Sequence, residues 1–460
     1  MPDSIVTQDT QGQELDNSIS SFFLQFHIGR LLRKCNAAKE KGFSVTELFK
    51  YKFCNAFQKS SMYMQQKTGA FRERFSKNTY YRFLNDSRIN WMRFTTLLSK
   101  EVADTIEPLT DAGRINAFVI DDSLFERTSC GSTELGSRVF DHTVMQYKKG
   151  YRMMTCGWTD GNTFLPINSC LLASSEEKNL YCAGRTFDGR SLAAKRRKLA
   201  QTKGTTVMLE LLQTAMTAGH HADYVLFDTW FSSPAQLMAI KALGLDAIAM
   251  IKRNANIHYW YKGQSLSIDE IFNQCKKRRG RSRYLLSVNV SVTSGGKKIP
   301  AKIVCLRNRS NRKKWVSFIS TDPDLSEDEI IRIYGKRWQI EVFFKASKSY
   351  LQLTTECHSL SYDALTAHVA IVFARYLMIA LEQRRDKDLR TLGQIFYFLT
   401  DELADITFIE SAAVILKALF TSIEKVFQPT DEQMHAFIVD FVDNIPGYIR
   451  LTLRRCCYEV

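Results

Sequence analysis

The spacing of hydrophobic residues changes twice along the chain and divides it into three regions. From Ile19 to about Leu109 apolar residues recur at helical spacing, which predicts a helical region. From Ala117 onward short apolar runs of strand type alternate with helical segments, which predicts an α/β core. After Tyr362 the spacing is helical again. We therefore expect an α/β core flanked by N-terminal and C-terminal helical regions.

The central region reads as a β-β-β-α-β-α-β series. The predicted strands are residues 117–120, 151–158, 164–172, 224–227 and 246–251, and the predicted helices are residues 205–218 and a segment beginning at Ser233. Asp160-Gly161 favours a tight turn between the second and third strands. These patterns predict a three-stranded antiparallel meander followed by two α/β units.

Two of these strands end in acidic residues. Asp121-Asp122-Ser123 follows the first strand, and Asp228 follows the fourth. Aspartate is common at strand ends as a turn former or helix cap, so each acid alone carries little information. If the two strands pair in parallel, however, their carboxyl ends meet at one edge of the sheet and Asp122 and Asp228 lie side by side.

Further polar residues lie together on one face of a predicted helix. Ser326 and Glu329 form a capping box that predicts one long helix over residues 326–351. At about 100° per residue, four polar side chains fall within roughly 60° of one another: Tyr334, Arg337, Glu341 and Lys348. A solvated helix with an ion pair is the simpler interpretation, but arginine before glutamate at this spacing is the less favourable order.

The spacing Tyr-x2-Arg-x3-Glu-x6-Lys resembles the YREK signature of bacterial insertion-sequence transposases of the DDE superfamily, often called the insertion-sequence-four family. The resemblance implies a ribonuclease H-like catalytic core in which Asp122, Asp228 and Glu341 are the catalytic acids. Asp122 is preferred to Asp121 because members typically follow this acid with a hydroxyl residue, here Ser123. Asp121 would then be a supporting or helix-capping acid.

The same resemblance implies contacts with DNA. It assigns Tyr334, Arg337 and Lys348 to phosphates near the transposon end, which suits a phenol and two cations. Trp315 resembles a tryptophan that receives a flipped base in hairpin-forming relatives, although a half-buried strand tryptophan is an equally good interpretation.

Three carboxylates without histidine or cysteine suit hard ions such as Mg2+ or Mn2+. Two such ions about 4 Å apart support in-line phosphodiester displacement. The resemblance implies a transposase that acts on double-stranded DNA by cut-and-paste transposition, as a homodimer in the synaptic complex. Two alternatives stay open: a two-metal DNA nuclease without strand transfer, and a DNA-binding protein that has lost catalysis.

Composition adds limited support. The 63 Lys and Arg against 48 Asp and Glu give a net charge of +15, which favours a polyanionic partner without separating DNA from RNA or a membrane. The 11 cysteines are scattered without a C-x2-C pair, so neither a disulfide framework nor a zinc site is expected. The chain start lacks a signal-peptide pattern, and the apolar run 365–381 contains His368 and Arg375, which favours a buried helix. These features suit a bacterial cytoplasmic protein associated with the nucleoid.

Two basic segments are further candidates for DNA contacts: residues 71–84 and the loops of the segment 253–322. In residues 71–84 a helix capped at Ser76 would present Lys77, Asn78 and Arg82 to a groove, although an ordinary amphipathic helix fits equally well.

The predicted domains are a flexible N-terminus (1–18), a helical DNA-binding domain (19–112), the first part of the catalytic core (113–252), a β-rich insertion with basic loops (253–322), the signature helix that completes the core (323–358) and a helical C-terminal region (359–460).

Overall fold

The computed structural model describes residues 18–385 with gaps at 59, 70, 72, 111–113, 128–129, 142–143, 279–283 and 308–314, together with 426–430, 432–434 and 436–437. The chain divides into two compact units, Asp16–Phe396 and Met1–Leu15 with Tyr397–Val460, and all that follows concerns the first unit. Residues 1–17 of the predicted flexible N-terminus lie outside the described residues, and so does the predicted helical C-terminal region after residue 385, apart from the short described ranges between 426 and 437.

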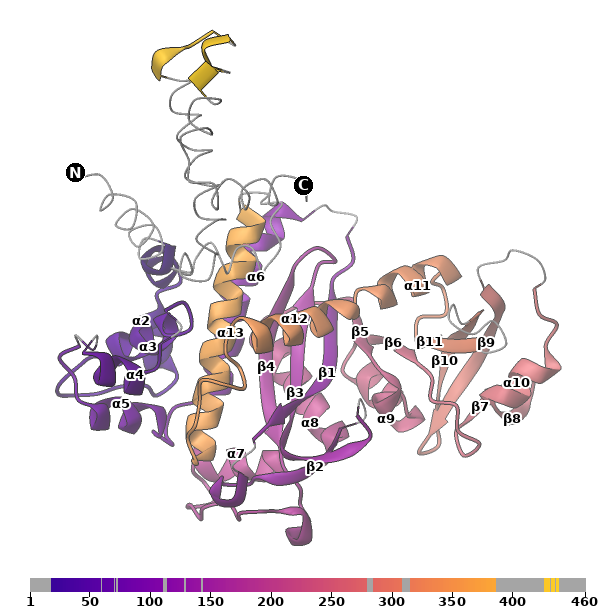
Figure 1. The fold of residues 1–460 in the computed structure, drawn as a ribbon. Coiled ribbons are helices and arrows are strands. Elements are labelled where there is room, and N and C mark those ends of the chain that lie inside the picture. Colours follow the sequence, from indigo (N-terminus) through magenta and orange to yellow (C-terminus); the bar gives the residue numbers. More distant parts are fainter. Residues whose placement is uncertain are drawn as a thin grey trace. The chain divides into compact units, whose positions relative to one another are not determined.

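A mixed sheet runs through the first unit and contains eleven strands among the described residues (Figure 1). Its order is β2-β3-β1-β5-β6-β11-β10-β9-β7-β8, and β4 pairs with β3. Only β1 with β5 and β5 with β6 are parallel within this part of the chain. The strands are β1 Ala117–Glu126, β2 Ser137–Asp141, β3 Gln146–Thr159, β4 Phe164–Leu172, β5 Tyr224–Phe227, β6 Asp246–Met250, β7 His258–Tyr261, β8 Gln264–Ser267, β9 Tyr284–Ser294, β10 Lys297–Arg307 and β11 Trp315–Ser320.

The predicted antiparallel meander is confirmed as β1, β3 and β4. Its tight turn forms because the buried Asp160 carboxylate accepts the backbone N–H groups of Asn162 at 2.8 Å and Thr163 at 2.7 Å, while Gly161 takes a positive φ of 96°. Strand β2 was not predicted, because it lies in a polar segment without a clear alternation of apolar residues.

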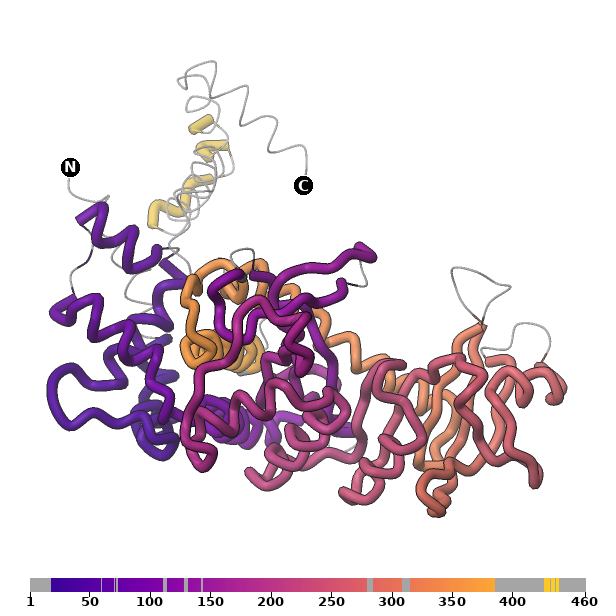
Figure 2. The backbone as a smooth tube through the Cα atoms, turned by 90° about the horizontal axis from the view of Figure 1, so that it is seen from below, coloured from indigo at the N-terminus to yellow at the C-terminus, as the bar shows by residue number. Residues whose placement is uncertain are grey.

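The strands after β6 extend the same sheet. Strand β11 pairs antiparallel with β6, β10 pairs with β11, and β9 pairs with β10. In Figure 2 the salmon and orange segments that contain these strands lie to one side of the purple and magenta part of the chain. The β-rich segment predicted at 253–322 is therefore joined to the core sheet by backbone hydrogen bonds.

The described helices are α2 Ile28–Lys34, α3 Val45–Cys54, α4 Met62–Thr68, α5 Lys77–Leu84, α6 Trp91–Ile106, α7 Leu192–Ala200, α8 Gly204–Thr217, α9 Pro234–Ala242, α10 Ile268–Gln274, α11 Glu327–Gly335, α12 Trp338–Ser349 and α13 Tyr362–Arg385. Helices α6 to α13 include those that contact the sheet, whereas α2 contacts α6, and α3 and α5 contact α13. The predicted cap is confirmed for α5, because the Ser76 hydroxyl accepts the Thr79 N–H at 3.3 Å. Helices α6 and α13 both contact β4.

The single long helix predicted over residues 326–351 is instead two helices, α11 and α12. Its capping box is present, since the Ser326 hydroxyl accepts the Glu329 N–H at 3.3 Å. The helix is interrupted after Gly335, where Lys336 and Arg337 donate to carbonyls three residues back, both at 3.0 Å. Glycine has low helix propensity, so this is where the regular hydrogen bonding breaks most easily.

Helix α13 confirms the buried helix predicted over residues 365–381. Among the described residues it alone is long and apolar enough to cross a membrane, but 94% of its apolar window is buried inside the protein. The fully buried Arg375 lies within it.

A buried ion cluster joins α13 to the N-terminal helices. The Glu356 carboxylate accepts from Lys52 of α3 at 2.7 Å and from Arg375 of α13 at 2.7 Å. Arg375 also donates to the Phe53 carbonyl at 2.9 Å. Although burial opposes ionisation, the two cations hold the pKa of Glu356 well below its usual range.

Replacing Glu356 with glutamine should therefore destabilise the protein strongly. The change leaves two buried cations without a counter-charge, and breaking a buried pair in this way costs about 3–5 kcal/mol. Urea denaturation measures the loss. The control is Asp188→Asn, which removes an exposed pair with Arg190 and should leave the urea midpoint unchanged. Equal midpoints for both variants would contradict the assigned role of the cluster.

The buried His368 predicts a pH dependence. Burial lowers the pKa of His368 to about 3, below the value of about 6.5 in an unfolded chain. As pH falls below about 6.5, the His368 side chain binds a proton in the unfolded state but not in the folded state, so the free energy of unfolding decreases. His368→Gln should reduce the slope of unfolding free energy between pH 6 and 5 by about 1.4 kcal/mol per pH unit. The exposed His258→Gln change is the control, and an unchanged slope in His368→Gln would refute the prediction.

Candidate functional site

The candidate site lies where the parallel pairing of β1 and β5 ends; β5 ends there, whereas β1 continues to Glu126 beyond the end predicted for it at residue 120. Their last paired residues are Ile120 and Phe227, so Asp121 and Asp228 follow at matching positions of neighbouring strands. Side chains at matching positions of parallel strands project from the same face. The predicted parallel pairing is thus confirmed, and it places Asp121, rather than Asp122, level with Asp228.

The two adjacent aspartates face opposite sides of the sheet, because successive side chains of a strand alternate. Asp121 accepts from Arg337 of α12 at 2.9 Å. Asp122 accepts from Arg152 of β3, with Nε at 3.1 Å. The structure therefore brings Asp121 toward α12 and leaves Asp122 with a partner within the sheet.

Arg337 connects the acids of two distant segments. One terminal nitrogen of its guanidinium donates to Asp121 and the other donates to Glu341 at 2.5 Å. The side chain of Arg337 is 13% exposed, that of Asp121 is 19% exposed and that of Glu341 is 35% exposed. The ion pair of the simpler interpretation is thus present, between the N-cap residue Arg337 and Glu341 of α12, and it is part of a three-residue bridge from α12 to β1.

Asp121 lies in a strongly acidic environment. Burial, together with repulsion from Asp122 and Asp228, raises the pKa of Asp121 to about 7, even though Arg337 opposes the shift. A carboxylate with so high a pKa is a recognised mark of a functional site. Asp228 also accepts the backbone N–H of Thr229 at 2.6 Å, so it caps the short 3-10 turn Thr229–Phe231 as well.

Lys348 reaches the same strand from about two turns beyond Glu341 on α12. Its ammonium group donates to the Ser123 hydroxyl at 2.7 Å, and burial lowers the pKa of the ammonium group. Ser123 lies two residues after Asp121 on β1, so both side chains project toward α12. A cavity of about 410 Å³ opens here, lined by Asp122, Ser123, Arg152 and Lys348 among others.

Tyr334 is buried rather than exposed. Its ring packs against Phe318 at 4.6 Å between centroids, and it is 9% exposed. Among the described residues its hydroxyl has no hydrogen-bond partner, and neither has Nε of Arg337. Two buried donors without partners beside the acids leave hydrogen-bonding capacity for a ligand.

Trp315 is stacked within the protein. Its ring lies parallel to Phe272, with centroids 4.1 Å apart and an interplanar angle of 13°, and Arg253 lies 4.3 Å from its centroid. The ring is half-buried at the start of β11. These contacts match the interpretation as a half-buried strand tryptophan, and its contact with a base stays a prediction.

The acids fit a hard divalent cation by their chemistry. In the described part of the chain no three His, Cys, Asp or Glu side chains are gathered closely enough to hold a metal as they stand. Arg337 instead supplies positive charge to Asp121 and Glu341. Three carboxylates and no histidine or thiolate form a donor set that suits Mg2+ or Mn2+.

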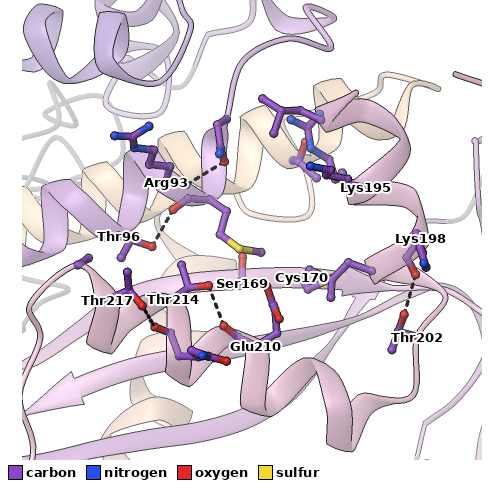
Figure 3. Close-up of a pocket in the computed structure, with 18 of the residues that line it drawn as sticks. Arg93, Thr96, Ser169, Cys170, Lys195, Lys198, Thr202, Glu210, Thr214 and Thr217 are labelled. Atoms are coloured by element: carbon purple, nitrogen blue, oxygen red, sulfur yellow. Dashed lines mark hydrogen bonds between the residues drawn. The ribbon is translucent and has the colours of Figure 1, made fainter. Parts of the chain in front are cut away.

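A separate open cleft of about 1030 Å³ lies among α6, α7, α8 and β4 (Figure 3). Its basic side chains include Arg93, Lys195 and Lys198, and none of the predicted site residues lines it. The hydroxyls of Thr96, Thr202, Thr214 and Thr217 donate to carbonyls of their own helices. These four hydroxyls are therefore already hydrogen-bonded to the backbone.

Sequence reasoning preferred Asp122 and gave Asp121 a supporting role. By the alternation of the strand, Asp121 continues the series Ala117, Val119 on the face toward α12. The preference for Asp122 rested on the hydroxyl residue that follows it, and the catalytic role of either acid stays a prediction.

The sequence profile of the DDE superfamily endonucleases matches residues 45–288. This range is more than half of the 460 residues and includes Asp121, Asp122 and Asp228, and it ends before α11 and α12. No curated protein sequence matches the chain significantly. Enzymes of this superfamily generally use divalent metal ions. The chain belongs to the DDE superfamily endonucleases, a family whose substrate is DNA.

Proposed function

We propose that this protein is a DNA transposase of the insertion-sequence-four type, which cuts DNA at insertion-sequence ends and joins those ends to target DNA. The observation that carries the proposal is the bridge from Asp121 through Arg337 to Glu341. It connects the family-matched β1 with the YREK signature helix, 220 residues later along the chain. The parallel β1–β5–β6 arrangement with the β1–β3–β4 meander supports a ribonuclease H-like core.

In this proposal Asp121 takes the role first predicted for Asp122. Three features support the change: Asp121 is level with Asp228, it is linked to Glu341 through Arg337, and its pKa is raised to about 7. Asp122 is engaged by Arg152 instead. The proposed catalytic acids are therefore Asp121, Asp228 and Glu341.

These three acids would hold Mg2+ or Mn2+, and the ions would activate a water or DNA 3′-hydroxyl and stabilise the departing oxygen. Beside a divalent cation Asp121 would stay ionised, since a nearby positive charge favours the carboxylate form. Arg337 would then turn toward a DNA phosphate, together with Tyr334 and Lys348. Its Nε and the Tyr334 hydroxyl have the unused donor capacity that such a contact requires.

Other surfaces would bind DNA away from the acids. Lys77, Asn78 and Arg82 are exposed on α5, as a groove-binding helix requires. The predicted basic loops of the 253–322 segment suit the phosphate backbone. We include in the proposal a homodimeric synaptic complex, the helical DNA-binding region 19–112 and the helical region 359–460.

Excision from a donor plasmid that carries this gene with its native flanks tests the proposal. Asp121→Asn and Glu341→Gln should each lower Mg2+-dependent release of the element by more than about a hundredfold, because loss of even an indirect metal partner costs about 10- to 100-fold. Asp122→Asn is the matched control. It removes an adjacent acid of the same strand and should retain most of the activity. All variants should still bind end DNA.

Two results would contradict parts of this proposal. If Asp122→Asn abolishes release and Asp121→Asn does not, the assignment of the first acid fails. If no protein cuts although all bind DNA, the catalytic proposal fails. Capture of the released fragment in a target plasmid separates a transposase from a nuclease, because hydrolysis alone leaves free ends.

A further inference from the structure

Helix α7 contains a run of four basic residues, Lys195 to Lys198, whose side chains divide into two pairs. The middle pair faces the core, because the buried Arg197 donates to Asp363 at 2.8 Å and Arg196 pairs with the same carboxylate. Lys195 and Lys198 are exposed, and neither forms an ion pair with a described residue. The middle pair therefore fixes α7 to α13, whereas the outer pair is left for a partner of the protein.

The outer pair lines the open cleft of about 1030 Å³ among α6, α7, α8 and β4 (Figure 3). Arg93 of α6 is a third exposed cation there. Glu210 of α8 is the only acid among the described residues that line the cleft. An excess of positive charge in a cleft attracts a negatively charged partner. Since the cations belong to α6 and α7, that partner would present its acids to those two helices.

The same cleft has an apolar surface. Met92 and Leu97 of α6 and Leu192 and Leu199 of α7 line it, and all four are half-buried. Leu192, Lys195 and Leu199 share one face of α7, because they are three and four residues apart. Partly exposed apolar side chains are stabilised when a partner covers them. A partner that fits the cleft is therefore apolar on the side that enters it and acidic on its flank.

Buried hydrogen bonds hold the walls of the cleft in place. Helices α6, α7 and α8 all contact β4. The buried Asn168 of β4 donates to the Thr96 hydroxyl of α6 at 3.3 Å and to the Leu211 carbonyl of α8 at 3.1 Å. Arg197 of α7 donates to Glu134 at 2.6 Å. Because the walls are fixed before a partner arrives, binding costs little ordering of the protein.

An amphipathic helix with acidic flanks has the properties that the cleft requires. Its apolar face would cover the leucines, and its acids would reach the three cations. Laying such a helix into a hydrophobic groove is a recurrent mode of protein recognition. Helical walls also offer ridges and grooves against which another helix packs. Duplex DNA would bring phosphates to the cations, but its bases are stacked inside the duplex and would leave the apolar surface uncovered.

We propose that the cleft among α6, α7, α8 and β4 is a docking site for an acidic amphipathic helix of a partner protein. The proposal goes beyond the proposed function and does not rest on it, because docking requires neither DNA nor metal. None of the predicted site residues lines the cleft, so a docked helix would leave the candidate acids accessible.

The test measures binding of two short labelled peptides to the full chain by fluorescence anisotropy. One peptide carries leucines on one face of a helix and glutamates elsewhere, and the other has the same composition in scrambled order. The wild-type protein should bind the amphipathic peptide saturably and about tenfold more tightly than the scrambled one, since only the former gathers its leucines on one face.

Variants of the cleft test its charge and its apolar surface separately. Lys195→Glu combined with Lys198→Glu should weaken binding of the amphipathic peptide about tenfold, because two attractions become repulsions. Leu199→Gln keeps every charge and should weaken binding as well. The control is Arg30→Glu combined with Arg33→Glu, which makes the same change of charge at the same spacing on exposed residues of α2, away from the cleft. This control should bind the peptide like the wild type.

Three outcomes would overturn the docking site. The wild-type protein would bind the two peptides equally, or the α7 and α2 double variants would bind the amphipathic peptide equally. The third outcome concerns a different occupant, and duplex DNA binding of the same variants measures it. If the α7 double variant lost duplex binding while its peptide affinity stayed unchanged, the cleft would be a DNA surface.

Discussion

The candidate site depends on the electrostatic bridge that Arg337 makes between Asp121 and Glu341. Without the guanidinium, a half-buried glutamate and a buried aspartate would face one another near Asp228 with no compensating charge. Like charges in low dielectric repel strongly, and isolated buried carboxylates protonate instead. The bridge therefore keeps the acids together in the protein without metal, and it fixes α12 against β1.

The rest of the fold supports this bridge. The parallel register of β1 and β5 sets Asp121 level with Asp228, and the break between α11 and α12 sets where Arg337 begins the second helix. Lys348 attaches the far end of α12 to β1 through Ser123. Beyond α12, the chain passes Glu356, whose buried ion pairs join α13 to α3. Helix α12 is thus held at both ends by contacts of charged side chains, which a change in protonation would weaken.

Much of the fold could be predicted from the sequence because local signals were strong. The capping box at Ser326, the turn at Asp160-Gly161 and the apolar runs of β1, β5 and β6 each depend on neighbouring residues, and each is present. Strand β2 was missed because its polar residues carry no alternation, and the helix break was missed because Gly335 alone is tolerated in many helices. Pairing of β11 with β6 could not be read locally, because no local pattern specifies which distant strands adjoin.

The candidate site was predicted in part for the same reason. Motif spacing and strand ends pointed to Glu341 and Asp228, whereas the ion pair of Asp121 with Arg337 could not be predicted without knowing which face of β1 meets α12. The direct test is to locate Mn2+ in crystals of the protein by anomalous scattering. The account predicts Mn2+ bound by Asp121, Asp228 and Glu341, with Arg337 moved away from the two acids it bridges. Mn2+ at Asp122, or an undisturbed bridge at saturating Mn2+, would contradict it.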